Sequence, residues 1–373
     1  MPELTATTAD ALARLSPASV GDSRAVWRAL GRAGVLAALY PSRAGDRAGS
    51  HAPCPDRLRE VLATLDAGHP LGVVLSACVQ IATALPILRE HATDGPVAAA
   101  YHSAVRGESV LALAATDADG AGSDLMSLGT TARLSDDQVV LDGEKWWITN
   151  ACTAQHVLVL ARHRPQRHFT SFLWVLVPTD RPGVTAVPAA DGLFAGAGLG
   201  RLVFRGVTLG RDHVIGTPGR GLATFARHIA TERFAGALWA AALSRRVLAD
   251  VHDRLTARPL GEGVMWDNPA IRQRFARCLV EAWRIDAACT AFRAADPGNA
   301  RVAGMLLKAA VAESLDMLLS ECAQLVGAEA FVRNGIAQLR AEAGMFGTAG
   351  GAAGAMLAGI AEHAPDLLGR WER

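Results

Sequence analysis

The sequence predicts an α+β protein with three domains. These are an N-terminal α-helical domain (residues 1–109), a middle antiparallel β domain (110–217) and a C-terminal antiparallel four-helix bundle (218–373). Two observations predict this architecture. A chain of 373 residues exceeds the size at which a single hydrophobic core stops growing, and half of its residues are apolar. The spacing of the apolar residues also changes twice along the chain, from helical to short β-like runs and back.

The N-terminal zone is predicted to be helical over residues 23–39, 54–67 and 72–90, with Pro and Gly between these segments. Its longest apolar run, 71–85, is interrupted by Gln80 and Thr83 and is too short to cross a bilayer. Residues 1–10 lack the pattern of a signal peptide. The six cysteines show no CxxC or zinc-finger spacing, which is typical of reduced thiols. We therefore expect a cytoplasmic protein that does not enter a membrane.

The middle zone contains short, partly β-branched runs at residues 110–115, 138–141, 156–160, 169–177 and 201–204. Turn-forming pairs such as Asp142-Gly143 and Pro182-Gly183 separate them. This pattern of short apolar runs separated by turns predicts the small antiparallel β domain.

The C-terminal zone returns to long stretches with apolar residues at helical spacing, at 222–257, 269–295 and 299–326. Pro259, Pro297-Gly298 and Gly327 separate these stretches and mark sharp ends of helices. Long helices joined by short connections predict an antiparallel bundle.

The charges are nearly balanced, with 37 Lys and Arg residues against 36 Asp and Glu residues. Because a nucleic-acid binder normally carries a basic excess, we do not expect a nucleic-acid partner. The eleven histidines lack metal-ligand spacing, so no metal is expected. Lysine occurs only at Lys145 and Lys308, which we interpret as a sign of GC-rich coding and not of function.

Two motifs in the middle zone are more specific. The first reads Thr116-Asp117 … Gly120-Ala-Gly122-Ser123-Asp124, and the second reads Lys145-Trp-Trp147-Ile-Thr149-Asn150. In these motifs and their separation the chain resembles the acyl-CoA dehydrogenase family of flavoproteins, over roughly residues 20–360. The resemblance implies an FAD cofactor and the α,β-dehydrogenation of an acyl thioester.

The resemblance also implies cofactor contacts. Trp147 and Thr149 have period-two spacing, which would place them on one side of a strand. Trp147 would pack on the isoalloxazine, Thr149 would bond near its N5 edge and Thr116 would bond its pyrimidine edge. Ser123 would bind the pyrophosphate and border the substrate. An ordinary core tryptophan is the alternative for Trp147.

Two further cofactor segments are only partly kept. The family's Arg-x-x-Phe-Gly stretch is matched by Arg258-Pro-Leu-Gly261, without the phenylalanine, and its glutamine–glycine motif by Gln324 and Gly327. By resemblance these residues contact the cofactor of a neighbouring subunit. Ordinary surface or bundle positions are the alternative for Arg258 and Gln324.

The catalytic base is where the sequence departs from most of the family. The late glutamate is absent, because the matching segment is Gly347-Thr-Ala349-Gly350-Gly351 and Ala349 occupies its place. A minority of relatives carries the base on the first bundle helix before an arginine, which here is Glu232 followed by Arg233. On a helical wheel, Glu232 projects from an apolar face formed by Phe225, Ile229, Gly236, Trp239 and Leu243.

Glu232 is therefore the predicted catalytic base, because a carboxylate on an apolar face suits proton abstraction near neutral pH. The alternative is a structural Glu232–His228 pair, since His228 lies one turn earlier. Arg233 and Ala349 are expected to border the substrate, and the N–H group of Ala349 is expected to help bind the thioester carbonyl.

Three functions remain open at this stage. The first is dehydrogenation of an acyl thioester carried by CoA or by an acyl-carrier protein, with an electron-transfer flavoprotein or oxygen as acceptor. The second is a flavin-dependent monooxygenase or oxidase, which needs no α-proton base. The third is a non-catalytic partner subunit in a mixed oligomer. By resemblance we expect a homo-oligomer, a dimer or tetramer, with a hetero-oligomer as the alternative.

Overall fold

The computed structural model describes residues 2–41, 51–117, 122, 124–189 and 192–371. The chain divides into two compact units, Met1–Glu232 and Arg233–Arg373. The boundary between them falls inside one long helix, and each unit is described separately below.

The N-terminal part of the first unit consists of helices, as the sequence predicts. The predicted helix at 23–39 is two helices, because Gly34 adopts a positive φ of 75° that ends the first one. The Asp22 carboxylate caps this first helix by accepting from the N–H groups of Arg24 and Ala25. The sequence patterns missed the first and last helices of this region. The helices are α1 (Pro2–Ala13), α2 (Ser23–Arg32), α3 (Val35–Ala38), α4 (Pro55–Gly68), α5 (Leu71–Val79), α6 (Leu85–His91) and α7 (Gly95–Val105).

Helices α5 and α6 are joined without a break by a π-helical turn, Gln80–Ala84. The continuous helix therefore extends to His91, beyond the apolar run 71–85 seen in the sequence. Leu71–His91 and Ile336–Glu362 are long and apolar enough to cross a membrane. The first is 94% buried within the protein, as a core helix is, and the second is interrupted at Gly344 and again around Gly350.

The middle region forms a sheet in the order β6-β7-β3-β2-β4-β5-β8, with β1 beside β4. Its pairings are antiparallel except that β1 and β2 run parallel to β4, which corrects the prediction of a purely antiparallel sheet. The sequence patterns missed β2, β6 and β8, which are short or exposed. The strands are β1 (Leu111–Ala114), β2 (Thr131–Leu134), β3 (Gln138–Ile148), β4 (His156–Arg162), β5 (Phe172–Pro178), β6 (Val184–Pro188), β7 (Gly200–Gly210) and β8 (Val214–Ile215).

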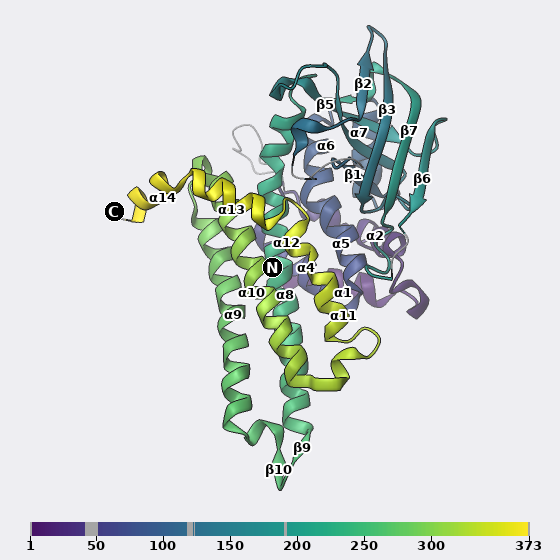
Figure 1. Cartoon of the computed structure of the whole chain (residues 1–373). Helices are drawn as coiled ribbons and strands as arrows, with labels where there is room; N and C mark the ends of the chain where they lie inside the picture. Colours follow the sequence, from purple (N-terminus) through teal and green to yellow (C-terminus); the bar gives the residue numbers. More distant parts are fainter. Residues whose placement is uncertain (1, 42–50, 118–121, 123, 190–191, 372–373) are drawn as a thin grey trace. The chain divides into compact units, whose positions relative to one another are not determined.

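The central strands β4 and β5 are buried almost along their whole length and form the core of the sheet. Helices α5 and α6 lie beside this sheet (Figure 1). The π-helical turn between them is bonded to the first residue of β1, because the side chain of Gln80 accepts from the N–H group of Leu111 at 2.8 Å. The turn thus has a fixed place against the sheet.

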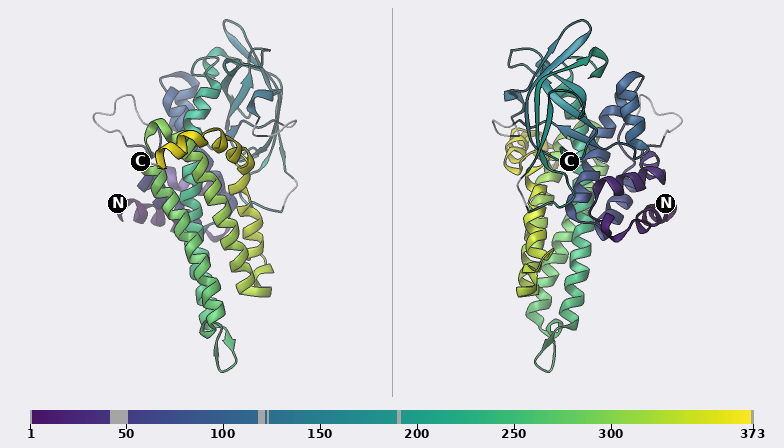
Figure 2. Two further views of the ribbon diagram at one scale, coloured as in Figure 1. Left: turned by 60° about the vertical axis from the view of Figure 1, so that its left-hand side comes forward. Right: turned by 90° about the vertical axis from the view of Figure 1, so that its right-hand side faces the viewer.

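The second unit contains the long helices that the sequence predicts. Helix α8 (Gly221–Ala257) enters it at Arg233, and a hairpin of β9 (Pro259–Leu260) and β10 (Gly263–Val264) connects α8 to α9 (Pro269–Ala294). Helix α10 (Ala300–Val326) returns beside α9, as Figure 2 shows. In place of one fourth helix, the chain continues in short helices: α11 (Ile336–Ala343), α12 (Met345–Thr348), α13 (Ala353–Glu362) and α14 (Ala364–Trp371). Glycines lie between the first three of them, and His363 lies between α13 and α14.

Candidate functional site

The end of β3 carries the tryptophan predicted to face a flavin. The register with β7 shifts between Lys145 and Ile148, and Trp147 has a positive φ of 56°, which is strained for a bulky residue. Strand β3 ends at Ile148, so Thr149 lies in the following turn. The argument that Trp147 and Thr149 share one side of a strand is therefore wrong, because strand alternation does not hold across a bulge and a strand end.

The strained backbone leaves the Trp147 side chain 67% exposed, so it is not a core tryptophan. Its neighbour Trp146 is engaged, because its indole N–H donates to Glu144 and the guanidinium of Arg201 lies 5.3 Å from the centre of its ring. Trp147 thus presents a broad apolar face on a rigid strand. An exposed aromatic face held by a strained backbone fits a flat ring ligand.

Thr116 lies next to these tryptophans. Its carbonyl oxygen accepts from the N–H group of Trp146 at 3.2 Å, and Asp117 forms an antiparallel bridge with Lys145. Thr116 and Trp147 are therefore brought together from segments thirty residues apart, as the motifs imply. Ser123, the predicted pyrophosphate and substrate contact, lies outside the described residues.

A buried ion pair anchors the Thr116 segment. Lys145 is fully buried, and its Nζ lies 2.5 Å from Asp117 Oδ1 and donates to the carbonyl oxygen of Ala115 at 2.9 Å. Burial lowers the pKa of Lys145 from 10.5 to about 8, and the Asp117 carboxylate opposes this shift. The interpretation of the sparse lysines as a sign of GC-rich coding does not account for a lysine at this buried, paired position.

The predicted base, Glu232, lies on α8 at the end of the first unit and is partly buried. Its Oε2 accepts a hydrogen bond from the Thr83 hydroxyl at 2.8 Å. The apolar face predicted for this side of α8 is present, since Ile229, Trp239 and Leu243 are all buried.

The alternative of a Glu232–His228 pair is wrong. His228 is buried and shares a hydrogen bond with Glu90 Oε2 on α6 at 2.8 Å, and Glu90 also pairs with Arg227. Burial, with further contributions from Arg227, His51 and His91, lowers the pKa of His228 from 6.5 to about 4. His228 is therefore neutral at physiological pH. Its partner is Glu90, whereas the partner of Glu232 is Thr83.

In the second unit, the glycine-rich segment that replaces the family's late glutamate is held by two cations. Arg233 Nε donates to the carbonyl oxygen of Gly350 at 3.2 Å, and Lys308 Nζ donates to that of Ala349. Lys308 is 9% exposed, so both lysines of the chain are buried. The N–H group of Ala349 donates to the carbonyl oxygen of Met345 at 2.8 Å. This contradicts the expectation that it is available for a thioester carbonyl.

Arg258 lies close to Gly327 although the two residues come from separate segments. Arg258 Nη1 donates to the carbonyl oxygen of Val326 at 3.0 Å, and Gly327 has a positive φ of 73° just after α10 ends. Gln324 Oε1 accepts from Arg274 at 2.9 Å. The predicted cofactor contacts are therefore engaged within the unit.

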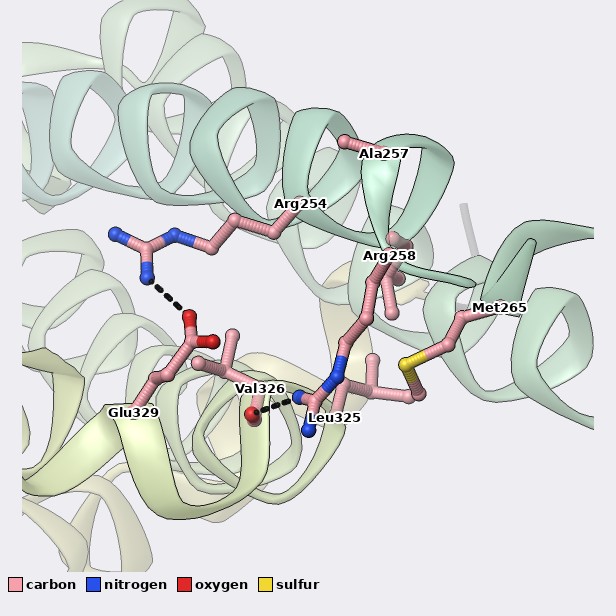
Figure 3. A pocket seen from close by; sticks show the side chains of 8 residues that line it. Arg254, Ala257, Arg258, Met265, Leu325, Val326 and Glu329 are labelled. Carbon is pink, nitrogen blue, oxygen red and sulfur yellow. Dashed lines mark hydrogen bonds and ion pairs between the residues drawn. The ribbon is translucent and has the colours of Figure 1, made fainter. Parts of the chain in front are cut away.

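Arg258 lines a cavity of about 280 Å³ (Figure 3). The guanidinium of Arg254 points toward Glu329, with which it forms an ion pair at 3.1 Å, and Arg258 points toward the end of α10. The remaining wall is apolar and is formed by Leu255, Ala257, Met265, Leu325 and Val326.

Sequence reasoning missed Thr83, Glu90 and Lys308. Thr83 did leave a signal, since it interrupts an otherwise apolar run, and Lys308 left one as one of two lysines in the chain. Glu90 had no local signal, because its role depends on contact with a helix more than 130 residues later.

Comparisons with known proteins cover most of the chain. The family profile described as acyl-CoA dehydrogenase, middle domain, matches residues 112–207. The profile described as acyl-CoA dehydrogenase, C-terminal domain, matches residues 219–364.

Individual relatives are distant. An acyl-[acyl-carrier-protein] dehydrogenase, MbtN, from Mycobacterium sp. (strain MCS) is 27% identical over 257 residues, which are 67% of this chain and 64% of that protein. The structure of the prolyl acyl carrier protein oxidase AnaB has a TM-score of 0.85 at 18% identity, over 97% of this chain and 98% of that one. The FAD complex of PigA has a TM-score of 0.82 at 17% identity, over 98% and 97% of the two chains. These structural likenesses establish the fold.

Proposed function

Because this chain belongs to the acyl-CoA dehydrogenase family, we propose that it is an FAD-dependent oxidoreductase that forms an α,β double bond in an acyl thioester. Glu232 is the proposed base. One observation supports this assignment above others. The Glu232 carboxylate lies on a largely apolar helix face with a hydroxyl as its partner, and among the described residues no cation forms an ion pair with it.

The chemistry requires two bonds to hydrogen to break. Glu232 takes the proton from the α-carbon, and the electron pair of that C–H bond forms the new double bond. Bound FAD, with Trp147, Thr116 and Thr149 as its proposed contacts, would supply the acceptor for the β-hydrogen and its two electrons. Glu232 is free to act because His228 is paired with Glu90 and does not compete for its carboxylate.

Trp147, Thr116 and Thr149 are the proposed flavin contacts in the first unit. The exposed Trp147 ring supports this, as does the hydrogen bond that holds Thr116 beside Trp146. Ser123, Arg258, Gln324 and Gly327 remain proposed contacts, and Arg233, Ala349 and Ser123 remain proposed neighbours of the substrate. Because Arg258 and Gln324 have internal partners, FAD binding at their side requires these residues to exchange partners.

The acyl group is proposed to be carried by an acyl-carrier protein or CoA. The likeness to MbtN and AnaB favours a carrier protein. Because AnaB is named an oxidase, its likeness favours oxygen over an electron-transfer flavoprotein as the electron acceptor. We also propose that the protein is a cytoplasmic homo-oligomer, either a dimer or a tetramer. Large exposed apolar side chains on the second unit, such as Trp283 (69% exposed) and Phe331 (82% exposed), favour association.

The proposal is tested by anaerobic bleaching of the flavin in the purified holoenzyme, with a panel of acyl-CoA and acyl-carrier-protein thioesters. We expect bleaching with at least one thioester, and Glu232→Gln should lower its rate at least 1,000-fold, an order-of-magnitude value for loss of a catalytic base. Glu281→Gln is the matched control, since Glu281 is a buried glutamate of α9 that pairs with Arg284. No bleaching with any thioester contradicts the proposal.

A second candidate is a partner subunit that binds FAD only together with a homologous chain. The internal partners of Arg258 and Gln324 and the engaged N–H group of Ala349 favour it. The visible spectrum of the protein purified alone distinguishes the two. A flavin spectrum supports the enzyme, whereas a colourless protein that gains FAD on co-expression with a homologue supports the partner subunit. Oxygen-dependent turnover that survives Glu232→Gln supports an oxygenase.

A further inference from the structure

The π-helical turn Gln80–Ala84 places two polar side chains, Gln80 and Thr83, in a largely apolar stretch of helix. All five of its residues are buried, and Thr83 is 0% exposed. A π-turn accommodates one extra residue, is less stable than regular α-helix, and occurs often at functional sites. The contacts of its residues should therefore explain why this turn is present.

Thr83 makes a contact that two other helical threonines of this unit, Thr8 and Thr64, do not make. Thr8 and Thr64 donate their hydroxyls to carbonyl oxygens four residues earlier in their own helices, the usual choice for a helical threonine. Thr83 donates instead to Glu232 Oε2 at 2.8 Å, across 149 residues of sequence. Both side chains belong to the same compact unit.

A buried network of amides holds the π-turn in place. Gln80 donates to the carbonyl oxygen of Ser76 at 3.0 Å and accepts from the N–H group of Leu111 at 2.8 Å. Asn150 donates to the same Ser76 oxygen at 3.2 Å and to the Leu111 oxygen at 2.9 Å. Asn150 is fully buried and has a positive φ of 66°. The network thus connects the π-turn with β1 and with the turn at Thr149 and Asn150 that follows β3.

We propose that Thr83 is the positioning residue of the Glu232 base, and that the Gln80–Asn150 network fixes Thr83 relative to the flavin-contacting turn. This inference depends on the proposed function. The hydroxyl holds Oε2, so Oε1 is the atom directed to receive the proton. A donor to a carboxylate also favours its charged, basic form over its protonated form. Thr83 itself exchanges no proton with the substrate.

The test compares Thr83→Val, which keeps the shape but removes the donor, with Thr83→Ser, which keeps the donor. The matched control is Thr8→Val, the same change at a threonine that is also 0% exposed but bonds to its own helix. The measurements are kcat and KM in the holoenzyme, obtained from anaerobic flavin bleaching. Thr83→Ala repeats the test without the buried methyl group if the valine variant does not fold.

For Thr83→Val we expect kcat/KM to fall about 10- to 100-fold, because Glu232 loses the hydroxyl that orients its carboxylate. The fall should be in kcat more than in KM. Thr83→Ser should restore kcat, and Thr8→Val should match the wild type. A loss of packing alone would not be restored by Thr83→Ser, because serine also lacks the methyl group of threonine.

A second measurement does not depend on turnover. The infrared carboxylate stretching band of Glu232, identified by its absence in Glu232→Gln, should shift in frequency in Thr83→Val and return to the wild-type position in Thr83→Ser, because the hydrogen bond to one carboxylate oxygen is lost and then restored. If the wild type bleaches with a thioester and Glu232→Gln abolishes this, but neither kcat nor the band changes in Thr83→Val, the positioning role alone is overturned. If the wild type never bleaches, the proposed function fails, and the infrared band still tests the contact.

Discussion

Asp117→Asn removes the negative charge that faces the buried amine of Lys145. The amide keeps the shape of the side chain and one oxygen for the N–H groups of Gly129 and Thr130, which bond to Asp117 in the wild type at 2.5 and 2.8 Å. The variant therefore measures chiefly the charge. Because the Lys145 amine titrates within an accessible pH range, its response to this change can be calculated.

The magnitude follows from the protonation of the amine. A Lys145 pKa of about 8 in the folded chain, against 10.5 without burial, means that its charge costs the wild type about 3.4 kcal/mol at pH 7. Without Asp117 the folded chain can instead bury Lys145 as a neutral amine. Removing the proton that the amine carries in the unfolded chain costs about 4.8 kcal/mol at pH 7. The carboxylate thus contributes at most about 1.4 kcal/mol through the amine. At pH 9.5 the amine is neutral in both folded proteins, and this contribution disappears.

The sign is set by proton binding. Between pH 8 and 10.5 the unfolded chain binds more protons at Lys145 than the folded chain, so this group makes stability rise with pH in that window. In Asp117→Asn the rise begins at lower pH. Its deficit in the free energy of unfolding should therefore shrink by up to about 1.4 kcal/mol between pH 7 and 9.5.

The assay is urea-induced unfolding followed by tryptophan fluorescence at pH 7 and 9.5, at fixed protein and FAD concentrations. Asp142→Asn is the matched control, because Asp142 pairs with the exposed Arg133, whose charge does not change over this range. The loss of unfolding free energy in Asp142→Asn should be below about 1 kcal/mol and equal at both pH values. An Asp117→Asn deficit that stays constant or grows at pH 9.5 would refute the reasoning.

Two further predictions concern His228 and Lys308. The neutral form of His228 is favoured in the folded chain, so its contribution is complete above pH 6.5 and is lost as the pH falls toward 4, by up to about 3 kcal/mol. Urea unfolding at pH 6.5 and 4.5 should therefore show a smaller loss of stability in His228→Gln than in the wild type, and equal losses would contradict this. Lys308→Met removes the donor to the Ala349 carbonyl oxygen, so hydrogen–deuterium exchange over residues 349–354 should accelerate about tenfold, whereas Lys308→Arg should stay near the wild type. Unchanged exchange in the methionine variant would show that Lys308 does not hold this segment.

The long helices of the second unit were predictable to within a few residues. The segments 222–257, 269–295 and 299–326 correspond to α8, α9 and α10, because each has sustained helical spacing and ends at Pro or Gly. Strands β2, β6 and β8 were not predictable, since they have two to five residues and their pattern depends on neighbouring strands. The parallel pairing of β1 with β4 is likewise a property of tertiary structure.

For the candidate site, the residue types were readable but their partners were not. The motifs located Trp147 and Glu232, yet the strained backbone of Trp147 and the contact from Thr83 to Glu232 appear only in the folded chain. His228 shows the same limit. Its position one turn before Glu232 suggested a pair between them, but Glu90 from a distant helix binds it instead.

Local patterns therefore established the order of helical and β regions and the family motifs, and they predict that Ala349 stands in the place of the family's late glutamate. Long-range packing established the π-helical turn, the burial of both lysines and the hydroxyl that holds Glu232. The physical reason is that helix and strand periodicity involves residues a few positions apart. The environment of a buried charge is built from side chains that are distant in the sequence, and Thr83 and Glu232 are 149 residues apart.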